Sequence, residues 1–79
     1  MLILYIYDIR AKNKKRFNRT KRLFYYHLGR MGLGKEAWKT KSVIAVQPKT
    51  EKAIDNLFKR FGNAIVVYKV LAETIERFE

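Results

Sequence analysis

The chain opens with an unbroken apolar run at residues 2–7, Leu-Ile-Leu-Tyr-Ile-Tyr. A run of this kind is typical of a β-strand that is covered on both faces. We expect Asp8 to end the strand, since it is the first charged residue after the run. A polar segment follows, in which Asn13 is a suitable N-cap for a helix.

Residues 14–32 have the periodicity of an amphipathic helix. The face expected to pack on the core carries Phe17, Thr20, Phe24, Leu28 and Met31. The opposite face carries a basic stripe with one aromatic residue, namely Lys15, Arg19, Arg22, Tyr26 and Arg30. The first turn holds Lys14, Lys15 and Arg16, the unfavourable charge for the positive end of a helix dipole. We infer that these cations serve something other than folding, although an exposed dipole effect is worth under about 1 kcal/mol.

Two glycines, Gly32 and Gly34, are expected to end this helix. Residues 36–47 then alternate in polarity, which predicts one long bent strand or two short ones, buried from Ser42 to Val46. Pro48 ends that segment.

A second helix is expected after Pro48, with Thr50 as its cap and Glu51 in its first turn. Its core-facing stripe is Ala53, Ile54, Leu57, Phe58 and Phe61. Gly62 is the expected residue after its C-terminus, and residues 64–71 are strongly β-prone. The tail, residues 72–79, fits either a helix or a strand added to a partner subunit.

This order predicts a single α+β domain over residues 1–79, a ferredoxin-like βαββαβ sandwich. One mainly antiparallel sheet would carry both helices on one face. The other face would then be apolar and bare, so that a second copy of the chain is expected to cover it. Because a chain this short buries only about 60% of its unfolded surface, self-association would also add stability. We therefore expect a homodimer.

Composition excludes several classes of protein. There are no cysteines, which rules out disulfides, thiolate catalysis and cysteine zinc sites, and a single histidine argues against a Ser–His–Asp triad. No apolar run approaches the length of a membrane span, of about 20 residues. The first apolar run is too short for a signal peptide and has no basic region before it, so we expect a cytoplasmic protein.

The net charge is +11, from 18 basic and 7 acidic residues. The positive charge is concentrated in residues 10–41, where the one acid is Glu36. The basic residues of this segment are Arg10, Lys12, Lys14, Lys15, Arg16, Arg19, Lys21, Arg22, Arg30, Lys35, Lys39 and Lys41. Such a block is typical of a protein that binds a polyphosphate, with a solvated surface or an anionic membrane as alternatives. The membrane alternative lacks an insertable apolar edge on the basic face.

Asp8 is the candidate for chemistry. It is the sole acid before residue 35, and it lies between an apolar strand and the basic segment. One carboxylate is too few ligands for a metal, but two copies related by a two-fold axis could share one Mg²⁺ between their Asp8 side chains. The alternative is that Asp8 caps a turn or pairs with Arg10, Lys12 or Arg16.

Other polar and aromatic residues have mainly structural interpretations. Tyr5 and Tyr7 are expected in the core or an interface, and His27 is expected to pack at the edge of the first helix. Ser42 has no base placed near it by spacing, although it could hydrogen-bond a phosphate. Trp38 beside Lys39 and Lys41 suits stacking on a nucleobase, or else it packs under the neighbouring helix.

The chain resembles the small CRISPR-associated adaptation proteins of the Cas-two family and their VapD-like relatives. The resemblance is carried by Tyr7-Asp8-Ile9 at the end of the first strand, by the basic helix after it, and by Ser42-Val43-Ile44 in a later strand. It covers nearly the whole chain in order and length. The chain departs from the family at Thr40, where a glutamine is common, and at Ile44-Ala45, where Phe-Glu often follows the valine.

The resemblance implies a ferredoxin-like homodimer that acts in antiviral defence, either as a Mg²⁺-dependent endonuclease on RNA or DNA or as a DNA-binding subunit beside an integrase partner. It assigns Asp8 as catalytic residue and metal ligand. With the basic pattern, it favours a nucleic-acid surface made of Lys14, Lys15, Arg16, Arg19, Arg22, Tyr26, Arg30, Lys39 and Lys41. The alternative function is a non-catalytic binding protein or small regulator. RNA-recognition domains share Leu4-Tyr5-Ile6 but need a third-strand aromatic motif that residues 42–47 lack.

Overall fold

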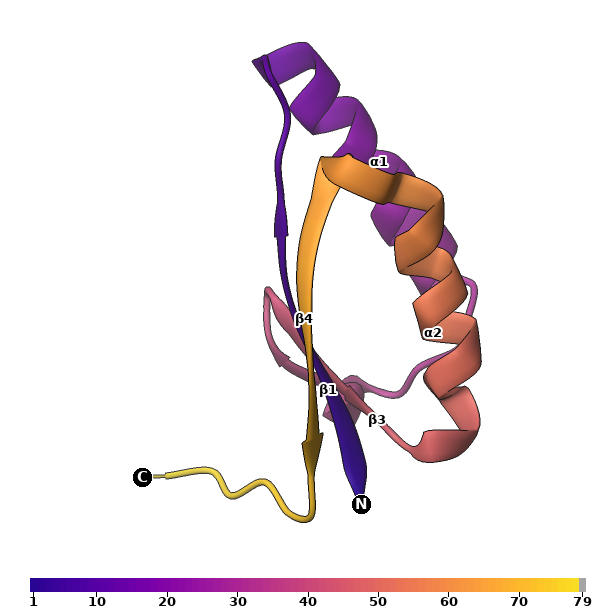
Figure 1. Ribbon diagram of the computed structural model, residues 1–79, viewed down its shortest axis with the longest axis vertical. Helices are drawn as coiled ribbons and strands as arrows, with labels where there is room; N and C mark the ends of the chain where they lie inside the picture. Colours follow the sequence, from indigo (N-terminus) through magenta and orange to yellow (C-terminus); the bar gives the residue numbers. More distant parts are fainter. Residues whose placement is uncertain (79) are drawn as a thin grey trace.

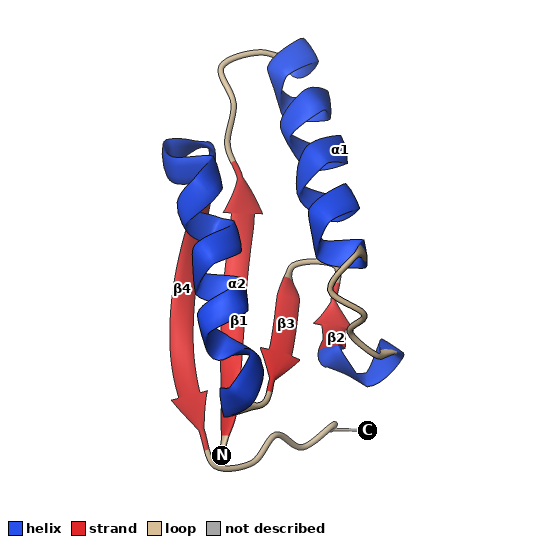
Figure 2. Cartoon of the chain, turned by 90° about the vertical axis from the view of Figure 1, so that its right-hand side faces the viewer, coloured by secondary structure: helices blue, strands red, loops and turns tan. Residues whose placement is uncertain are grey.

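The computed structural model describes residues 1–78, which form four strands and two α-helices in the order βαββαβ. These elements are β1 (Leu2–Ile9), α1 (Lys14–Gly29), β2 (Trp38–Thr40), β3 (Val43–Val46), α2 (Pro48–Phe61) and β4 (Ile65–Ala72). The strands make one antiparallel sheet in the order β2-β3-β1-β4 (Figure 2). The α+β class is confirmed, and the arrangement fits a ferredoxin-like fold.

Both helices lie on the same face of the sheet, and the core fills the space between these two layers (Figure 1). Because successive side chains of a strand point to opposite faces, Ile3, Tyr5 and Tyr7 of β1 all point into this core. Each of them is buried. The Phe24 ring of α1 and the Phe58 ring of α2 meet there, with ring centroids 5.4 Å apart. The packing of Tyr5 and Tyr7 predicted from the sequence is confirmed.

The other face of the sheet is uncovered in the single chain (Figure 1). Most of its side chains are apolar. This bare face consists of the outward side chains of β1, β3 and β4, namely Leu2, Leu4, Ile6, Asp8, Val43, Ala45, Val66, Tyr68, Val70 and Ala72. Four of its large apolar residues are exposed, from Val66 at 38% to Tyr68 at 66%. An apolar face left open in one chain was expected from the sequence.

The first strand is longer than the sequence pattern indicated. It continues through Asp8 to Ile9, because β4 pairs with both residues, Asp8 opposite Val66 and Ile9 opposite Ile65. The expectation that Asp8 ends the strand is therefore wrong. Pairing with an eight-residue neighbour outweighs the local preference of a charged residue for the strand end.

Helix α1 begins as expected and ends early. The Asn13 side chain caps it by accepting a hydrogen bond from the Arg16 N–H at 2.9 Å. The helix ends at Gly29 rather than residue 32, and Gly32 takes the left-handed conformation, with φ of +68°, in the turn beyond. Phe17 was expected in the core but is 36% exposed. The first half of α1 extends past the end of the short strand β3, so less of the sheet lies beneath it (Figure 2).

The middle of the chain forms two short strands rather than one bent strand, with an irregular register between Trp38 and Thr40. Ser42 lies exposed in the turn between them, whereas burial from Ser42 onward was expected. Helix α2 starts at Pro48 with Gln47 as its N-cap, so the assignment of Thr50 as cap is wrong. Proline suits the first helical position because its fixed φ is already helical and its missing N–H is not needed there.

Three of the five residues in the expected α2 stripe are buried, and Phe61 packs partly against the core. Ala53 is exposed, contrary to expectation. Gly62 follows the helix with a φ of +51°, as the sequence indicated.

After β4, residues 73–78 adopt neither helix nor strand, so the helical alternative for this tail is wrong over the described residues. Pairing of the tail with a second copy stays a prediction, and Glu79 lies outside the described residues. Over residues 1–78, the chain contains no helix with the length and apolar character that crossing a bilayer requires.

Candidate nucleic-acid interface

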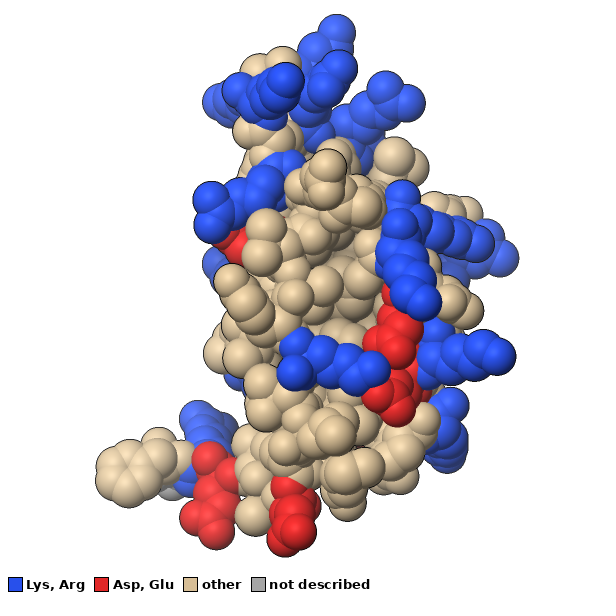
Figure 3. All heavy atoms as spheres, in the orientation of Figure 1, with Lys and Arg blue, Asp and Glu red and all other residues tan. Residues whose placement is uncertain are grey.

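Lysine and arginine side chains crowd the end of the molecule where α1 begins (Figure 3). Every residue from 10 to 19 is exposed. Within residues 1–78, Arg10 is the one member of the basic block that forms an ion pair with an acid. The positive charge at this end is therefore largely uncompensated by the protein itself.

The outward stripe of α1 is exposed along its whole length, as predicted. Its last two members interact with each other. The Arg30 Nη1 donates to the Tyr26 hydroxyl at 3.0 Å, and the guanidinium carbon lies 5.7 Å from the centre of that ring. This contact fixes the end of the stripe, while Lys15, Arg19 and Arg22 extend into solvent. The His27 ring packs edge-on against Tyr26.

Lys39 and Lys41 come from β2 and the turn after it. Both are exposed. The backbone of Lys41 is held firmly, because its carbonyl accepts hydrogen bonds from the Tyr7 hydroxyl at 2.9 Å and the Tyr25 hydroxyl at 3.1 Å. Burial and the contact with Tyr25 raise the pKa of Tyr7 above the ordinary value of 10.0, so this hydroxyl keeps its proton even at alkaline pH.

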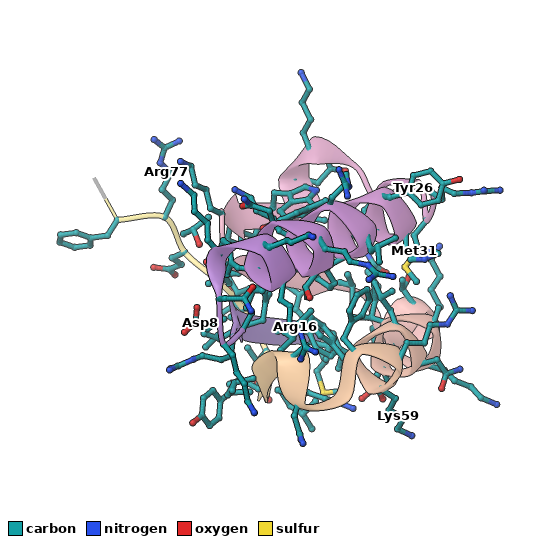
Figure 4. The ribbon with its side chains drawn as sticks, turned by 90° about the horizontal axis from the view of Figure 1, so that it is seen from above. Asp8, Arg16, Tyr26, Met31, Lys59 and Arg77 are labelled. Carbon is teal, nitrogen blue, oxygen red and sulfur yellow. The ribbon has the colours of Figure 1, made fainter. Side chains whose placement is uncertain are left out.

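Asp8 lies at the margin of the bare face, where its carboxylate forms an ion pair with the Arg10 guanidinium, with 2.9 Å between Oδ2 and Nε. Both side chains are about two-thirds exposed. The pairing with Arg10 is one of the alternatives that the sequence left open. Figure 4 shows Asp8 on the sheet side of the molecule and Tyr26 on the opposite side, so the end of the α1 stripe and this carboxylate point in different directions.

A single chain does not provide a complete divalent-cation site around Asp8. Among residues 1–78, no three acidic or histidine side chains gather in a way that could hold a metal ion. Mg²⁺ takes an octahedral shell that is often completed by waters and phosphate oxygens, and it usually needs one or two carboxylates from the protein. Asp8 supplies one such carboxylate in the single chain, and a second copy would supply the other.

A cavity of about 550 Å³ lies between the end of β1, the first half of α1 and the β2–β3 turn. Its aromatic wall is formed by Phe17, Tyr25 and Trp38, and the last two rings are stacked with centroids 5.8 Å apart. Lys21 and Lys41 line the same cavity, with Asp8 beside them. The cavity exists because β3 pairs with β1 only over Ile3–Ile6, while β1 continues to Ile9.

Sequence reasoning missed most of this cavity. Phe17, Lys21 and Tyr25 follow one another at intervals of four, a spacing that places them along one line of a helix. That signal was available, but Phe17 was assigned to the core stripe. The approach of Trp38 to Tyr25 depends on the tertiary fold and has no local signal.

A second polar network ties α2 to β4 on the covered side of the sheet. The Tyr5 hydroxyl donates to Asp55 at 2.7 Å, and the Lys69 ammonium donates to the same carboxylate at 3.0 Å. Although partial burial favours the neutral acid, these two hydrogen bonds lower the pKa of Asp55. Lys69 also pairs with Glu51, so its charge is compensated and takes no part in the basic end.

No family model, curated protein or solved structure matches the chain. Its function is therefore inferred from its own residues and their geometry.

Proposed function

We propose that this protein is a nucleic-acid-binding homodimer of the Cas-two kind, which grips phosphate backbones through the basic end of the molecule. The observation that carries the proposal is the uncompensated basic block, in which one of twelve cations is paired with an acid among the described residues. Cations held apart from protein acids are available to replace the counterions condensed on a polyanion. RNA and DNA are both consistent with this mode of binding.

The bare face supports the dimeric part of the proposal. Burying its exposed apolar residues would stabilise the assembly by roughly 25 cal/mol for each Å² of apolar surface that is removed from water. A second copy of the same face is a self-complementary partner about a two-fold axis. Such a dimer presents two α1 stripes on its outer sides, since both helices lie opposite the bare face (Figure 1).

The test is the salt dependence of binding to a labelled DNA duplex, measured by fluorescence anisotropy. The triple variant Lys15→Gln/Arg19→Gln/Arg22→Gln removes three cations of the α1 stripe. If each contacts one phosphate, the slope of log K against log salt becomes shallower by about 2.7 per chain. The control Lys49→Gln/Lys52→Gln/Arg60→Gln removes the same charge from α2 and is expected to change the slope much less. Equal effects of the two triples would contradict the assignment of the stripe.

A second candidate function, Mg²⁺-dependent cleavage of the bound strand, is favoured by the position of Asp8 on the bare face. In the dimer, Asp8 from each copy would hold the ion, which would stabilise charge on the scissile phosphate and activate a water. Arg10 holds the carboxylate in the free chain, so it must release Asp8 when the site forms. The same dimer without this activity is the DNA-binding subunit of an adaptation complex, beside an integrase partner.

Asp8→Asn separates cleavage from binding. We expect it to abolish Mg²⁺-dependent cleavage of labelled RNA and DNA while duplex affinity stays within about twofold of the wild type. The matched variant Arg10→Gln breaks the same ion pair but keeps the carboxylate, and it should still cleave. Cleavage by purified Asp8→Asn protein at the wild-type rate would eliminate the role given to this residue.

A further inference from the structure

The cavity beside β1 combines an aromatic wall, of which Tyr25 and Trp38 also pack against the core, with two exposed cations. Phe17 is 36% exposed although it belongs to the apolar side of α1. Trp38 is half-buried and stacks on Tyr25. Lys21 and Lys41 approach the same cavity from α1 and from the β2–β3 turn.

We propose that this cavity binds one unpaired nucleotide of a single strand, with the base against the aromatic wall and the neighbouring phosphate between Lys21 and Lys41. The proposal deepens the nucleic-acid function above and rests on it. A volume of about 550 Å³ is in the range of small-ligand pockets, which is about 300–1,000 Å³. Every base has a flat π-face, so stacking on aromatic side chains recognises an unpaired base whatever its identity.

Charge complementarity selects a nucleotide over an uncharged aromatic ligand, because Lys21 and Lys41 outnumber the Asp8 carboxylate, which is paired with Arg10. Neither lysine forms an ion pair within residues 1–78, so each can bind a phosphate without breaking an existing ion pair. The turn that carries Lys41 is held in place by the hydroxyls of Tyr7 and Tyr25. The backbone that carries one of the two cations is therefore fixed before any ligand arrives, so ordering this turn adds no entropy cost to binding.

The position of the cavity favours a single strand over a duplex. It lies under α1 at the edge of the sheet, with the end of β1 on one side and aromatic rings on the other. A base within a duplex is covered on both faces by its neighbours and would have to leave the stack to enter. An unpaired base needs no such step.

Trp38 is the sole tryptophan of the chain, so its fluorescence reports directly on this cavity. The probes are a twelve-nucleotide deoxythymidine strand and an abasic strand with the same number of phosphates. We expect the deoxythymidine strand to quench Trp38 and the abasic strand to bind without quenching, with affinity measured independently by anisotropy. Quenching by neither strand, although both bind with equal affinity, overturns the nucleotide pocket alone. Failure of both strands to bind while a DNA duplex is bound also overturns the pocket alone, and failure of the strands and the duplex to bind at low salt overturns the proposed nucleic-acid function.

Phe17→Ala removes part of the aromatic wall, and Leu23→Ala is its matched control. Leu23 is an exposed apolar residue of the same helix, at 42%, and lies outside the cavity. Phe17→Ala is expected to weaken binding of the deoxythymidine strand by about five- to a hundredfold and to leave the abasic strand unaffected. Circular dichroism of both variants verifies that α1 remains folded. Equal losses in the two variants, or an equal loss for both strands, would refute the stacking role.

Discussion

At the scale of single residues, Tyr7 links the core to the candidate interface. Its ring packs against Phe24 and Phe58, with centroids 5.1 and 5.6 Å away. Its hydroxyl reaches past the core to the Lys41 carbonyl in the turn beside the cavity. The Tyr7 side chain therefore contributes to the stability of the fold, and it also holds the turn that carries Lys41, a lysine proposed to bind phosphate.

Replacing Tyr7 by phenylalanine tests this double role through pH. Burial raises the pKa of Tyr7, so its hydroxyl stays protonated in the fold when the unfolded chain ionises near pH 10. The contribution of this shift to the free energy of unfolding is complete below pH 10. It is lost as the pH rises toward the pKa of Tyr7 in the folded state, at about 1.4 kcal/mol per pH unit. Urea unfolding from about pH 8 to 11 should show a shallower decline for Tyr7→Phe than for the wild type, after a loss of about 1 kcal/mol at neutral pH.

The control is Tyr26→Phe, because Tyr26 is an exposed tyrosine of α1 that lies outside the bare face. It should follow the wild-type decline. Identical pH profiles for Tyr7→Phe and the wild type would contradict the burial argument. Tyr5 adds to the alkaline loss of stability in both the wild type and Tyr7→Phe, since burial also raises the pKa of Tyr5.

At the scale of elements, the sequence pattern correctly predicted which segments are helices and strands. It did not predict the cavity that forms because β1 and β3 differ in length. The alternation of apolar residues placed Tyr5 and Tyr7 in the core, and Asn13 correctly marked the start of α1. The exposure of Phe17 could not be predicted from the residues around it, because it depends on β3 ending before β1 does. Periodicity assigns a residue to a face, whereas the neighbouring element decides whether that face is covered.

The first turn of α1 provides a prediction about stability and binding together. Lys14 lies directly after the Asn13 cap, where a negative charge is favoured by the helix dipole. Lys14→Glu should stabilise the protein by about 0.3–1 kcal/mol, seen as a rise of a few degrees in Tm, while it weakens duplex binding. Lys49→Glu changes the same charge in the first turn of α2 and should stabilise without weakening binding. A Lys14→Glu protein that binds duplex as tightly as the wild type would show that this turn lies outside the interface.

At the scale of the whole molecule, the bare face decides whether the protein works as one chain or two. Sedimentation velocity of the wild type should give a dimer, and Tyr68→Glu should give a folded monomer, because a buried unpaired carboxylate at the interface is costly. Tyr26→Glu places the same substitution on the other side of the molecule, at a tyrosine of similar exposure, and should remain dimeric. A wild-type monomer, or a dimer that survives Tyr68→Glu, would mean that the bare face is not the contact.

The separation of charge along the molecule affects how it meets a polyanion in solution. Its longest dimension is 37 Å, with the basic α1 end at one extreme and glutamates where β4 ends at the other (Figure 3). This length exceeds the Debye length of about 10 Å at 0.1 M salt, so an approaching phosphodiester chain senses one extreme at a time. If the protein binds nucleic acid as proposed, electrostatic torque would turn it before collision, with α1 leading and the glutamates behind. Productive encounters would then be faster than random orientation allows, and added electrolyte would slow association through lost steering.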